Sequence, residues 1–438
     1  MRIFSARYLS LYRGNAAKLS GFMNHSSTSI LRCDPTSITF SSKSDQPDVS
    51  SPETLDALRV AAHRLSNLHD TVAFPTETVY GLGANALNTD SVSQIFRTKR
   101  RPADNPLIVH VSSLSMLRTL LPDGYRIPPT YEILMKHFWP GPLTLLFPRR
   151  QGVIPEIVTA SQPTVAIRMP SHPVARALIA LAGVPLAAPS ANTSGKPSPT
   201  RAEHVLKDLD GKVGIILDGG QCGVGLESTV VDGLQEDGDI RILRPGGVTF
   251  EDITCVLRRE MDKTDDTVPN VLVHRRDYVD AVMEQAPTTP GMKYRHYSPT
   301  APVTLLLTQT KPPSSPPLSI KAYLRSLQES LLTSSGRPIR VGVLAPEDSD
   351  LWGCLRQDDV FEWHRHPLGP KDAPSTIAHR LFDGLITLDE ERVDHILIEE
   401  VSEKWEGLAI MNRVRKAASY VRWVSLGTPV ADDGISST

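Results

Sequence analysis

The amino-acid sequence predicts an α/β protein with two domains, and three observations support this prediction. The 438 residues exceed the usual length of a single domain. Short apolar runs typical of buried strands alternate with segments of helical periodicity. A charged and then proline- and glycine-rich stretch separates two such patterns. We therefore expect an N-terminal extension over residues 1–51, a first α/β domain over 52–260, a linker over 261–302, a second α/β domain over 303–429 and a tail over 430–438.

The first domain is expected to begin with a helix near Glu53, after a Ser-, Thr- and Pro-rich linker over residues 34–51. Apolar residues recur there at helical spacing, namely Leu55, Leu58, Ala62, Leu65 and Leu68. Apolar runs predict strands at Val72–Pro75, Leu107–Val111, Leu143–Phe147, Val165–Arg168, Gly214–Leu217, Thr229–Val231 and Ile240–Leu243. Helical patterns lie at Asp90–Thr98, Ser112–Leu121, Thr130–Phe138, Pro173–Leu181 and Arg201–Leu209. Alternation of this kind is typical of one α/β domain.

The second domain repeats the alternation on a smaller scale. Strands are expected at Val303–Leu307, Ile339–Leu344 and His395–Val401. Helices are expected at Ile320–Leu332, Thr376–Leu388 and Glu406–Ala418. Strands with intervening helices predict a small open sheet of Rossmann-like type.

The N-terminal extension has the composition of an organellar transit peptide. Residues 1–33 contain no acidic residue and five basic ones, namely Arg2, Arg7, Arg13, Lys18 and Arg32. A disordered basic tail is the alternative interpretation. Because Met23 offers a second start, the sequence predicts a cytoplasmic product, a mitochondrial product, or both.

Composition and charge exclude several classes of protein. A net charge of -2 argues against a surface that binds nucleic acid throughout, although it leaves room for a local basic patch. The four cysteines, Cys33, Cys222, Cys255 and Cys354, form no C-x-x-C pair, so neither a zinc knuckle nor a redox dithiol is indicated. No apolar run is long enough to span a membrane.

The common nucleotide-binding signatures are also missing. The nearest approach to a phosphate-binding P-loop, Ser194-Gly-Lys-Pro197, lacks the leading glycine. The glycines between residues 219 and 225 lead into a predicted strand, whereas a dinucleotide fingerprint must open a helix.

A cluster of cations nevertheless indicates phosphate chemistry. Arg97-Thr-Lys-Arg-Arg101-Pro-Ala-Asp-Asn105 places four cations within five residues, between a predicted helix and a predicted buried strand. Such a cluster can bind polyphosphate, since arginine offers bidentate geometry to phosphate oxygens. A solvated charged face is the alternative.

Two polar segments that follow apolar runs are suited to hold a small ligand. Phe74-Pro-Thr-Glu-Thr-Val-Tyr-Gly-Leu-Gly83 supplies hydroxyls, a carboxylate and glycines that permit close backbone approach. Pro189-Ser-Ala-Asn-Thr-Ser-Gly-Lys-Pro-Ser-Pro-Thr200 supplies hydroxyls, an amide and a lysine. The alternatives are a turn whose Thr and Glu cap a following helix, and a capping box of Thr200 with Glu203.

Two charged or titratable residues lie within predicted strands. His110 on an apolar strand is more often a satisfied core residue than a functional one. Arg168 ends a buried strand, so it needs an anionic partner, which could be a ligand carboxylate or a protein carboxylate. Together with the polar segments, these residues predict a cleft for a polar anion and a nucleotide.

Eight motifs in order carry a family resemblance. They are Pro75-Thr-Glu-Thr-Val-Tyr-Gly81, Lys99-Arg-Arg-Pro102, Asn105-Pro-Leu-Ile-Val-His110, Trp139-Pro-Gly-Pro-Leu-Thr144, Val165-Ala-Ile-Arg-Met-Pro170, Pro189-Ser-Ala-Asn192, Gly225-Leu-Glu-Ser-Thr229 and Leu243-Arg-Pro-Gly246. Over residues 53–425 the chain resembles the YrdC family of threonylcarbamoyl-AMP synthases, in its long form with Pro290-Gly-Met-Lys-Tyr-Arg-His-Tyr-Ser-Pro299 and a further domain. The resemblance implies a twisted-sheet catalytic domain with a deep cavity and a Rossmann-like C-terminal domain, joined by a linker that covers the site.

The resemblance also implies the reaction and its partners. The activity would be L-threonylcarbamoyladenylate synthase, a nucleotidyltransferase that uses L-threonine, bicarbonate and ATP with Mg²⁺ carried by ATP and no metal site of its own. The product would serve a downstream tRNA threonylcarbamoyltransferase that modifies tRNA reading ANN codons. Contact with RNA is possible, and no membrane partner is implied.

Site residues carry over motif by motif from the same resemblance. The catalytic set would be Lys99, Arg101, Ser190 and Asn192. The L-threonine set would be Thr78, His110, Arg168, Ser190 and Ser228, with Thr76 in reserve for Thr78. The ATP set would be Lys99, Arg101, Asn105, Thr164, Asn192, Thr200, Arg244 and a linker tyrosine, Tyr297 or else Tyr294.

Three other functions are alternatives to this interpretation. In a double-stranded RNA-binding module the same cations would contact RNA phosphates. A carbamoyl-transferring relative would carry zinc-binding cysteine motifs, against which the scattered cysteines argue. An inactive scaffold would not need the intact Lys99, Arg101, Ser190 and Asn192 set.

Overall fold

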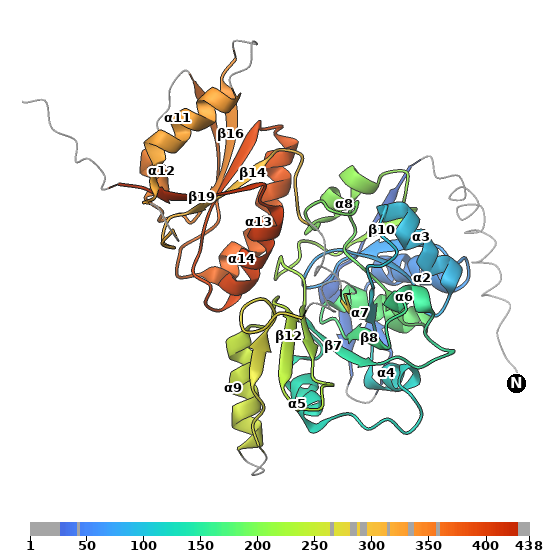
Figure 1. Ribbon diagram of the computed structural model, residues 1–438. Coiled ribbons are helices and arrows are strands. Elements are labelled where there is room, and N and C mark those ends of the chain that lie inside the picture. Colours follow the sequence, from blue (N-terminus) through green and yellow to red (C-terminus); the bar gives the residue numbers. More distant parts are fainter. Residues whose placement is uncertain are drawn as a thin grey trace, which may run out of the picture.

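The chain forms two α/β lobes that lie side by side (Figure 1). The computed structural model describes residues 27–41, 44–262, 267–280, 287–289, 296–312, 316–331, 337–355 and 360–427. The predicted transit-like segment falls mostly on residues 1–26, outside the described residues, so it stays a prediction. No helix in the described ranges combines the length and the apolar character needed to cross a bilayer.

The first lobe is built on a mixed sheet, which has 11 strands among the described residues in the order β1-β10-β4-β5-β9-β6-β8-β7-β11-β12-β13. The strands are β1 (Ser29–Arg32), β4 (Val72–Phe74), β5 (Gly81–Asn85), β6 (Ile108–His110), β7 (Leu143–Pro148), β8 (Thr164–Arg168), β9 (Leu186–Ala187), β10 (Ile215–Asp218), β11 (Thr229–Asp232), β12 (Ile240–Arg244) and β13 (Val271–Val273). Strands β6 and β8 are parallel and place His110 beside Arg168 at their carboxyl ends. The site is built at this edge.

Helices cover the first sheet because each has one apolar face. They are α2 (Pro52–Ser66), α3 (Thr89–Lys99), α4 (Leu114–Leu120), α5 (Pro129–Phe138), α6 (Glu156–Thr159), α7 (Pro173–Ala182), α8 (Ala202–Leu209) and α9 (Phe250–Met261). Helix α2 begins at Ser51, whose hydroxyl accepts a hydrogen bond from the Thr54 N–H, and has a proline in its first turn. Its Leu58 and Leu65 are fully buried in one apolar cluster with Leu178 of α7. The helices and strands predicted from periodicity in this lobe are thereby confirmed to within a few residues.

The predicted start of the first lobe near Glu53 is wrong. Structure begins before Glu53, because β1 pairs in parallel with β10, and β2 (Ile38–Phe40) pairs with β3 (Pro47–Val49). A short 3₁₀ turn, Pro35–Ser37, is capped by the Asp34 carboxylate. Strands this short show little periodicity among Ser, Thr and Pro, which explains why composition suggested a linker. At the other end β13 extends the sheet into the segment expected to be linker, and the division into domains stays a prediction.

Strand β5 was missed because its sequence, Gly-Leu-Gly-Ala-Asn, has low strand propensity. Gly83 is required by the ring of Phe74 on the neighbouring strand β4. A Cβ atom at Gly83 would lie 2.6 Å from that ring, whereas one at Gly81 would lie at an ordinary contact distance of 3.4 Å. The segment after Phe74 therefore leads into a strand and not into the helix that the alternative interpretation required.

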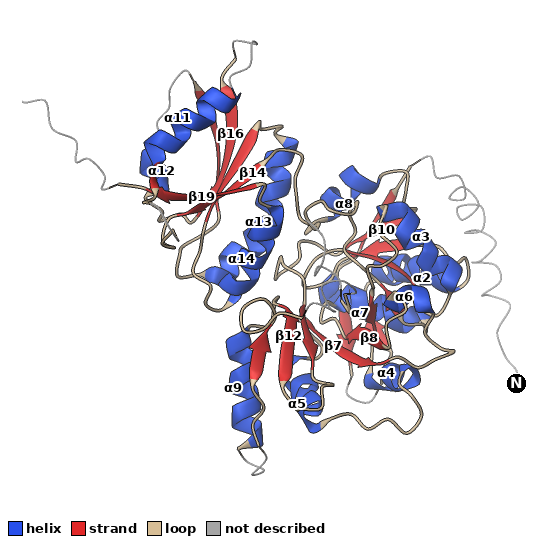
Figure 2. Cartoon of the chain, viewed as in Figure 1, coloured by secondary structure: helices blue, strands red, loops and turns tan. Residues whose placement is uncertain are grey.

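The second lobe contains a parallel sheet of six strands among the described residues, with helices on both sides (Figure 2). Its strands are β14 (Val303–Leu307), β15 (Leu318–Ser319), β16 (Ile339–Ala345), β17 (Phe361–Pro367), β18 (His395–Glu399) and β19 (Tyr420–Ser425). Its helices are α11 (Ile320–Leu331), α12 (Leu351–Cys354), α13 (Pro374–Glu390) and α14 (Glu406–Ala417).

The second sheet agrees with the expected open α/β layering but not with the dinucleotide-binding strand order. Its order is β15-β19-β14-β18-β16-β17, whereas the order of the dinucleotide-binding fold, in chain positions, is 3-2-1-4-5-6. The Rossmann-like description therefore applies to the layers alone. Strands β17 and β19 were not predicted, because half-exposed strands with charged residues lack a continuous apolar run.

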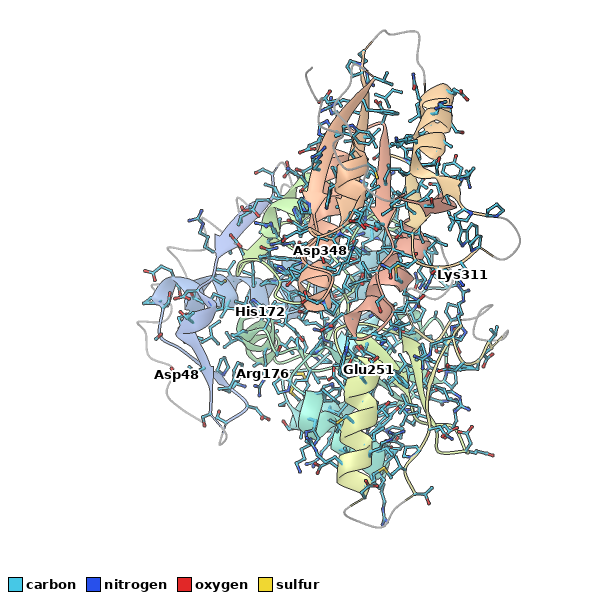
Figure 3. The ribbon with its side chains drawn as sticks, turned by 90° about the vertical axis from the view of Figure 1, so that its left-hand side faces the viewer. Asp48, His172, Arg176, Glu251, Lys311 and Asp348 are labelled. Carbon is cyan, nitrogen blue, oxygen red and sulfur yellow. The ribbon has the colours of Figure 1, made fainter. Side chains whose placement is uncertain are left out.

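The two lobes share one apolar core at their junction. Val79 and Leu226 of the first lobe and Tyr297 of the linker belong to the cluster formed by α13, α14 and β14. Gly225 has a φ of +78°, and a Cβ atom there would lie 2.5 Å from the His379 backbone. Glu251, at the start of α9 below the second lobe (Figure 3), accepts a hydrogen bond from the Trp405 N–H at 3.2 Å. The two lobes therefore pack directly against each other.

Candidate active site

A cavity lies where the carboxyl ends of β6 and β8 meet the linker residues His296 and Tyr297. Its solvent-accessible volume is about 50 Å³. Eight residues singled out from the sequence line it, namely Thr78, Arg101, His110, Arg168, Ser190, Ser228, Arg244 and Tyr297. The reserve residue Thr76 lines it as well.

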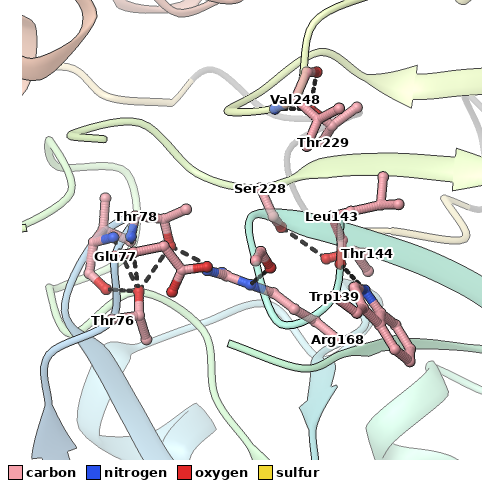
Figure 4. Close-up of polar contacts among 12 residues, drawn as sticks. Thr76, Glu77, Thr78, Trp139, Leu143, Thr144, Arg168, Ser228, Thr229 and Val248 are labelled. Atoms are coloured by element: carbon pink, nitrogen blue, oxygen red, sulfur yellow. Dashed lines mark hydrogen bonds and ion pairs between the residues drawn. The ribbon is translucent and has the colours of Figure 1, made fainter. Parts of the chain in front are cut away.

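One wall is organised by Arg168 (Figure 4). The guanidinium donates from Nη1 to the Thr78 hydroxyl at 2.8 Å and from Nε to the Gly141 carbonyl at 3.2 Å. Its Nη2 lies 2.6 Å from a carboxylate oxygen of Glu77, an ion pair without the alignment of a hydrogen bond. The anionic partner that the sequence required is thus a protein carboxylate, and Glu77 has no aligned hydrogen bond within the described residues.

The hydroxyls beside Arg168 are held by a tight turn between β4 and β5. Thr76 Oγ1 lies 2.7 Å from Thr78 Oγ1 and donates to the Val79 carbonyl at 2.6 Å. The Thr76 hydroxyl also accepts from the backbone N–H groups of Thr78 and Val79. Thr76 therefore positions the turn, while Thr78 presents its hydroxyl to the cavity.

His110 faces the same wall as a neutral imidazole. Burial lowers its pKa to about 3, and the charge of Arg168 contributes. Its Nδ1 lies 3.2 Å from the Ile108 carbonyl. His110 is thus both a satisfied core residue and a cavity residue.

A second wall is formed by Arg101 and Arg244. Arg101 donates to the carbonyls of Asn105 and Pro106 at 3.1 and 2.8 Å. Arg244 donates to the Ser228 carbonyl at 2.9 Å and to its hydroxyl at 3.2 Å. Burial, followed by the charge of Arg244, lowers the pKa of Arg101. Two mutually repelling cations held by neutral oxygens suit an anionic ligand such as phosphate.

Ser228 connects the two walls. Its hydroxyl lies 2.7 Å from that of Thr144 on β7, and its backbone holds Arg244. Figure 4 shows the hydroxyls of Ser228 and Thr144 pointing toward one another above the Arg168 side chain.

Lys99 lies behind the cavity and not among its lining residues. Its ammonium group donates to the carbonyls of Ser190 and Asn192, and lies 3.4 Å from the Asn192 side-chain oxygen. Burial, and then Arg101, lower the pKa of Lys99 well below its usual value. The Asn192 amide donates to the carbonyls of Thr193 and Lys196. Lys99 and Asn192 therefore fix the segment that presents Ser190.

The linker closes the cavity through two aromatic residues. Tyr297 is 1% exposed, has a φ of +64° and packs against Phe382 of α13, with ring centroids 5.1 Å apart. Burial, followed by the charge of Glu227, raises its pKa to about 12. The adjacent His296 also lines the cavity, and burial lowers its pKa to about 3. Tyr294 lies outside the described residues, as does most of the expected lid.

Besides Lys99 and Asn192, three further residues expected to bind ATP do not line the cavity. Thr164 begins β8 and Arg168 ends it, so they lie about 13 Å apart along the strand. Asn105 is buried beneath the wall, where its carbonyl accepts from Arg101. Thr200 is buried, and its hydroxyl has no hydrogen-bond partner within the described ranges.

The capping box expected for Thr200 and Glu203 was wrong, because α8 has Arg201 at its N-cap and no side-chain cap. Helix boundaries read from sequence are uncertain by a residue or two, which is enough to misplace a cap.

Sequence reasoning missed Glu227 as a cavity residue, although it lies within one of the quoted motifs. Glu227 directly precedes Ser228 and lines the cavity. Its carboxylate accepts a hydrogen bond from the Ser198 hydroxyl at 2.6 Å. Its other oxygen lies 3.1 Å from the Arg413 guanidinium of α14. A glutamate in a loop gives no sign in sequence that a distant helix will neutralise it.

Comparisons with known proteins agree with this geometry. A family model described as telomere recombination (Sua5, YciO and YrdC) matches residues 67–246, and one described as threonylcarbamoyl-AMP synthase, C-terminal domain, matches residues 248–419. The threonylcarbamoyl-AMP synthase of Schizosaccharomyces pombe is 44% identical, over 84% of this chain and 90% of that protein. The Bacillus subtilis threonylcarbamoyl-AMP synthase is 43% identical, over 83% of this chain and 94% of that protein. The crystal structure of Pyrococcus abyssi Sua5 with L-threonine has a TM-score of 0.69 at 38% identity, covering 91% of this chain and 100% of that one.

Proposed function

The chain belongs to the Sua5, YciO and YrdC family of threonylcarbamoyl-AMP synthases, and from this premise we propose how its own cavity performs that reaction. The enzyme joins L-threonine, bicarbonate and ATP into L-threonylcarbamoyladenylate and releases pyrophosphate. The product is the activated group for threonylcarbamoyladenosine in tRNA that reads ANN codons. Relatives named as synthases over most of their length favour this function over an RNA-binding module or another carbamoyl transferase.

The observation that carries the proposal is the pairing of two different walls in one buried cavity. Arg168 and the Thr78 hydroxyl form a wall suited to an amino-acid carboxylate. Arg101 and Arg244 form a wall suited to phosphates. A ligand with a carboxylate at one end and a nucleotide at the other matches this arrangement.

In the first step bicarbonate loses hydroxide to give CO2, and the neutral amine of threonine attacks its carbon to give a carbamate. The proton that leaves the nitrogen combines with the hydroxide as water. In the proposal, Arg168 holds the carboxylate, while Thr78 and Ser228 bind the amine and the side-chain hydroxyl. Arg168 is positive, and His110 is neutral because its pKa is about 3. A positive neighbour disfavours the ammonium form, so the bound amine loses its proton more readily than in water.

In the second step a carbamate oxygen attacks the α-phosphorus of ATP, and the bond to the pyrophosphate leaving group breaks. Arg101 and Arg244 would stabilise the charge that develops on the phosphoryl oxygens and on pyrophosphate. Lys99 acts through the segment that it holds, Ser190–Asn192, as a positioning residue. Fixed charge and alignment provide the catalysis, so the mechanism needs no covalent enzyme intermediate.

Magnesium enters the proposal only as the ion that accompanies ATP. No group of three His, Cys, Asp or Glu residues that could hold a metal occurs within the described ranges. The carboxylate that lines the cavity, Glu227, is already bound to Ser198 and Arg413. The ion, when bound to the phosphates, would neutralise part of their charge, and we assign it no protein ligand.

The linker would keep water away from the carbamate and from the mixed anhydride, which hydrolyse readily. Tyr297 is buried in the core of the second lobe and borders the cavity. A free volume of about 50 Å³ is well below the ~300–1,000 Å³ of ordinary ligand pockets. In the proposal, His296 and Tyr297 move aside to admit substrates and return before the chemistry.

The direct test measures pyrophosphate release from residues 27–438 with ATP, Mg²⁺, bicarbonate and L-threonine. Each component is omitted in turn, and L-serine replaces threonine as a matched control. We expect release to require threonine and bicarbonate together. Release that is independent of threonine, or no release from a folded protein that binds ATP, would exclude the synthase.

The proposal extends to a downstream tRNA threonylcarbamoyltransferase that accepts the product, and to cytoplasmic and mitochondrial forms. Fluorescent fusions that begin at Met1 and at Met23 test whether cytoplasmic and mitochondrial forms exist. Identical localisation of the two fusions would exclude the role of residues 1–22 as a targeting segment.

A further inference from the structure

A single arginine of the second lobe reaches into the wall of the cavity. Arg413, on α14, is 0% exposed. Its Nε lies 3.1 Å from Glu227, and its Nη1 donates to the Pro245 carbonyl. Glu227 and Pro245 are the immediate neighbours of Ser228 and Arg244. Arg413 therefore contacts both segments that build the phosphate-side wall.

Glu227 makes this contact necessary. Glu227 lines the cavity beside Arg101 and Arg244, the two cations proposed to bind phosphate. Its carboxylate carries the same sign of charge as that ligand. The Ser198 hydroxyl donates to one oxygen at 2.6 Å, and Arg413 occupies the other. Arg413 and then Arg244 stabilise the Glu227 carboxylate, so without Arg413 more of its negative charge would face an incoming triphosphate, which like charges disfavour in a buried site.

Arg413 also lies close to the linker. Its guanidinium carbon is 5.9 Å from the centre of the Tyr297 ring, which itself borders the cavity. One side chain thus contacts the wall, the carboxylate in the wall and the aromatic residue that closes the site. Packing alone would not require a charge at this position, because an apolar side chain of similar volume fills buried space at least as well.

We propose that Arg413 is a positioning residue of the active site, which neutralises Glu227 so that the wall formed by the first lobe accepts the triphosphate of ATP. The second lobe is then part of the nucleotide site and not an appended module. This inference rests on the proposed function, since it names the lobe that completes the ATP wall.

The first experiment measures the Kd of a non-hydrolysable ATP analogue, together with KM and kcat, for Arg413→Gln. We expect Kd and the KM for ATP to rise at least about tenfold, with the KM for threonine changed by less than about threefold. Arg415→Gln is the matched control: Arg415 is on the same helix but exposed, and it pairs with Glu403. Its Kd and KM values should stay at those of the wild type.

The decisive experiment is charge rescue. In the double variant Glu227→Gln with Arg413→Gln, both charges are absent, and we expect the Kd for the analogue to return to within about threefold of the wild type. A packing role for Arg413 would leave the double variant as weak as the single one. An unchanged Kd in Arg413→Gln, or no recovery in the double variant, would overturn the proposal.

Arg413→Lys keeps the charge and serves if Arg413→Gln fails to fold, as judged by circular dichroism. We expect Arg413→Lys to bind the analogue within about threefold of the wild type, and weakening as large as that expected for glutamine would contradict a role based on charge. Because analogue binding does not require turnover, it tests Arg413 separately from the reaction. A wild-type protein that binds the analogue but releases no pyrophosphate with threonine would refute the proposed function alone.

Discussion

Two buried glutamate–arginine pairs border the cavity, and they differ in how firmly they are held. Glu77 and Arg168 both belong to the first lobe, with 2.6 Å between nitrogen and oxygen, but Glu77 has no aligned hydrogen bond within the described residues. Glu227 and Arg413 join the two lobes, and both oxygens of Glu227 have hydrogen-bond partners. In the proposed function Arg168 exchanges Glu77 for a substrate carboxylate, whereas Glu227 and Arg413 stay paired.

The difference assigns separate tasks to the two pairs. The pair within the first lobe keeps the arginine that is proposed to bind substrate from being buried without a counter-charge. A fully satisfied pair between lobes contributes stability and shapes the wall. Changes to each pair should therefore separate effects on threonine from effects on folding and ATP.

The largest expected effect comes from breaking the pair between the lobes. Arg413→Gln leaves Glu227 buried without its cation, so the free energy of unfolding should fall by about 3–5 kcal/mol. Urea unfolding at pH 7 measures the loss. In Glu227→Gln with Arg413→Gln the loss should be smaller, and an equal loss in both variants would show that packing, not charge, is responsible.

The same pair should depend on pH in a defined direction. Burial alone raises the pKa of Glu227, but Arg413, Arg244 and the Ser198 hydroxyl lower it to about 2. A lowered carboxylate pKa adds stability above the unfolded value of about 4.3, and this contribution disappears as pH falls towards 2. The stability difference between wild type and Arg413→Gln should therefore be full at pH 7 and shrink between about pH 4 and pH 2.

Breaking the pair within the first lobe should affect threonine instead. Arg168→Ala removes the proposed carboxylate partner, and kcat/KM for threonine should fall by roughly two orders of magnitude or more. Steady-state pyrophosphate release with varied threonine measures it, and Arg97→Ala, a cation exposed on α3, is the control. Normal threonine affinity in Arg168→Ala would contradict the assignment of Arg168.

A substitution that forces the lobes apart should weaken the Glu227–Arg413 pair without changing any charge. Gly225→Ala places a Cβ 2.5 Å from the His379 backbone at a φ of +78°, so the lobes have to separate slightly. We expect a loss of about 1–3 kcal/mol in stability and a rise in the KM for ATP. Gly223→Ala meets no atom within 4 Å and should behave as the wild type.

The smallest effect should come from an exposed pair at the same junction. Arg201 lies 2.9 Å from Asp383 of α13, but its side chain is 43% exposed. Arg201→Gln should cost less than about 1 kcal/mol, since water and salt screen such pairs. A loss as large as that of Arg413→Gln in the same urea assay would mean that burial does not determine how much an ion pair contributes to stability at this junction.

The sequence predicted the framework of the first lobe well, because its buried strands and amphipathic helices have clear periodicity. It also predicted most of the cavity, since Thr78, His110, Arg168, Ser190 and Ser228 lie in compact motifs. These motifs place each residue at a strand end or in a tight loop, where local sequence determines geometry.

Other features depend on contacts that are remote in sequence. Strand β5 needs glycine because of the Phe74 ring, and its composition therefore resembles a loop. Lys99 holds carbonyls of a segment about 90 residues away, which no local pattern indicated, and its role as a cation for phosphate stays a prediction. Arg413 lies 186 residues from its partner Glu227, and no local pattern could have connected them.

The apolar core shared by the lobes also has a consequence for folding. Val79 and Leu226 pack in the same cluster as α13 and α14, so the first lobe covers part of the apolar interior of the second. The heat-capacity trace of the protein should then show one endotherm whose calorimetric and van't Hoff enthalpies agree, although the chain contains two sheets. Expression of either half alone would expose this cluster to solvent and favour aggregation.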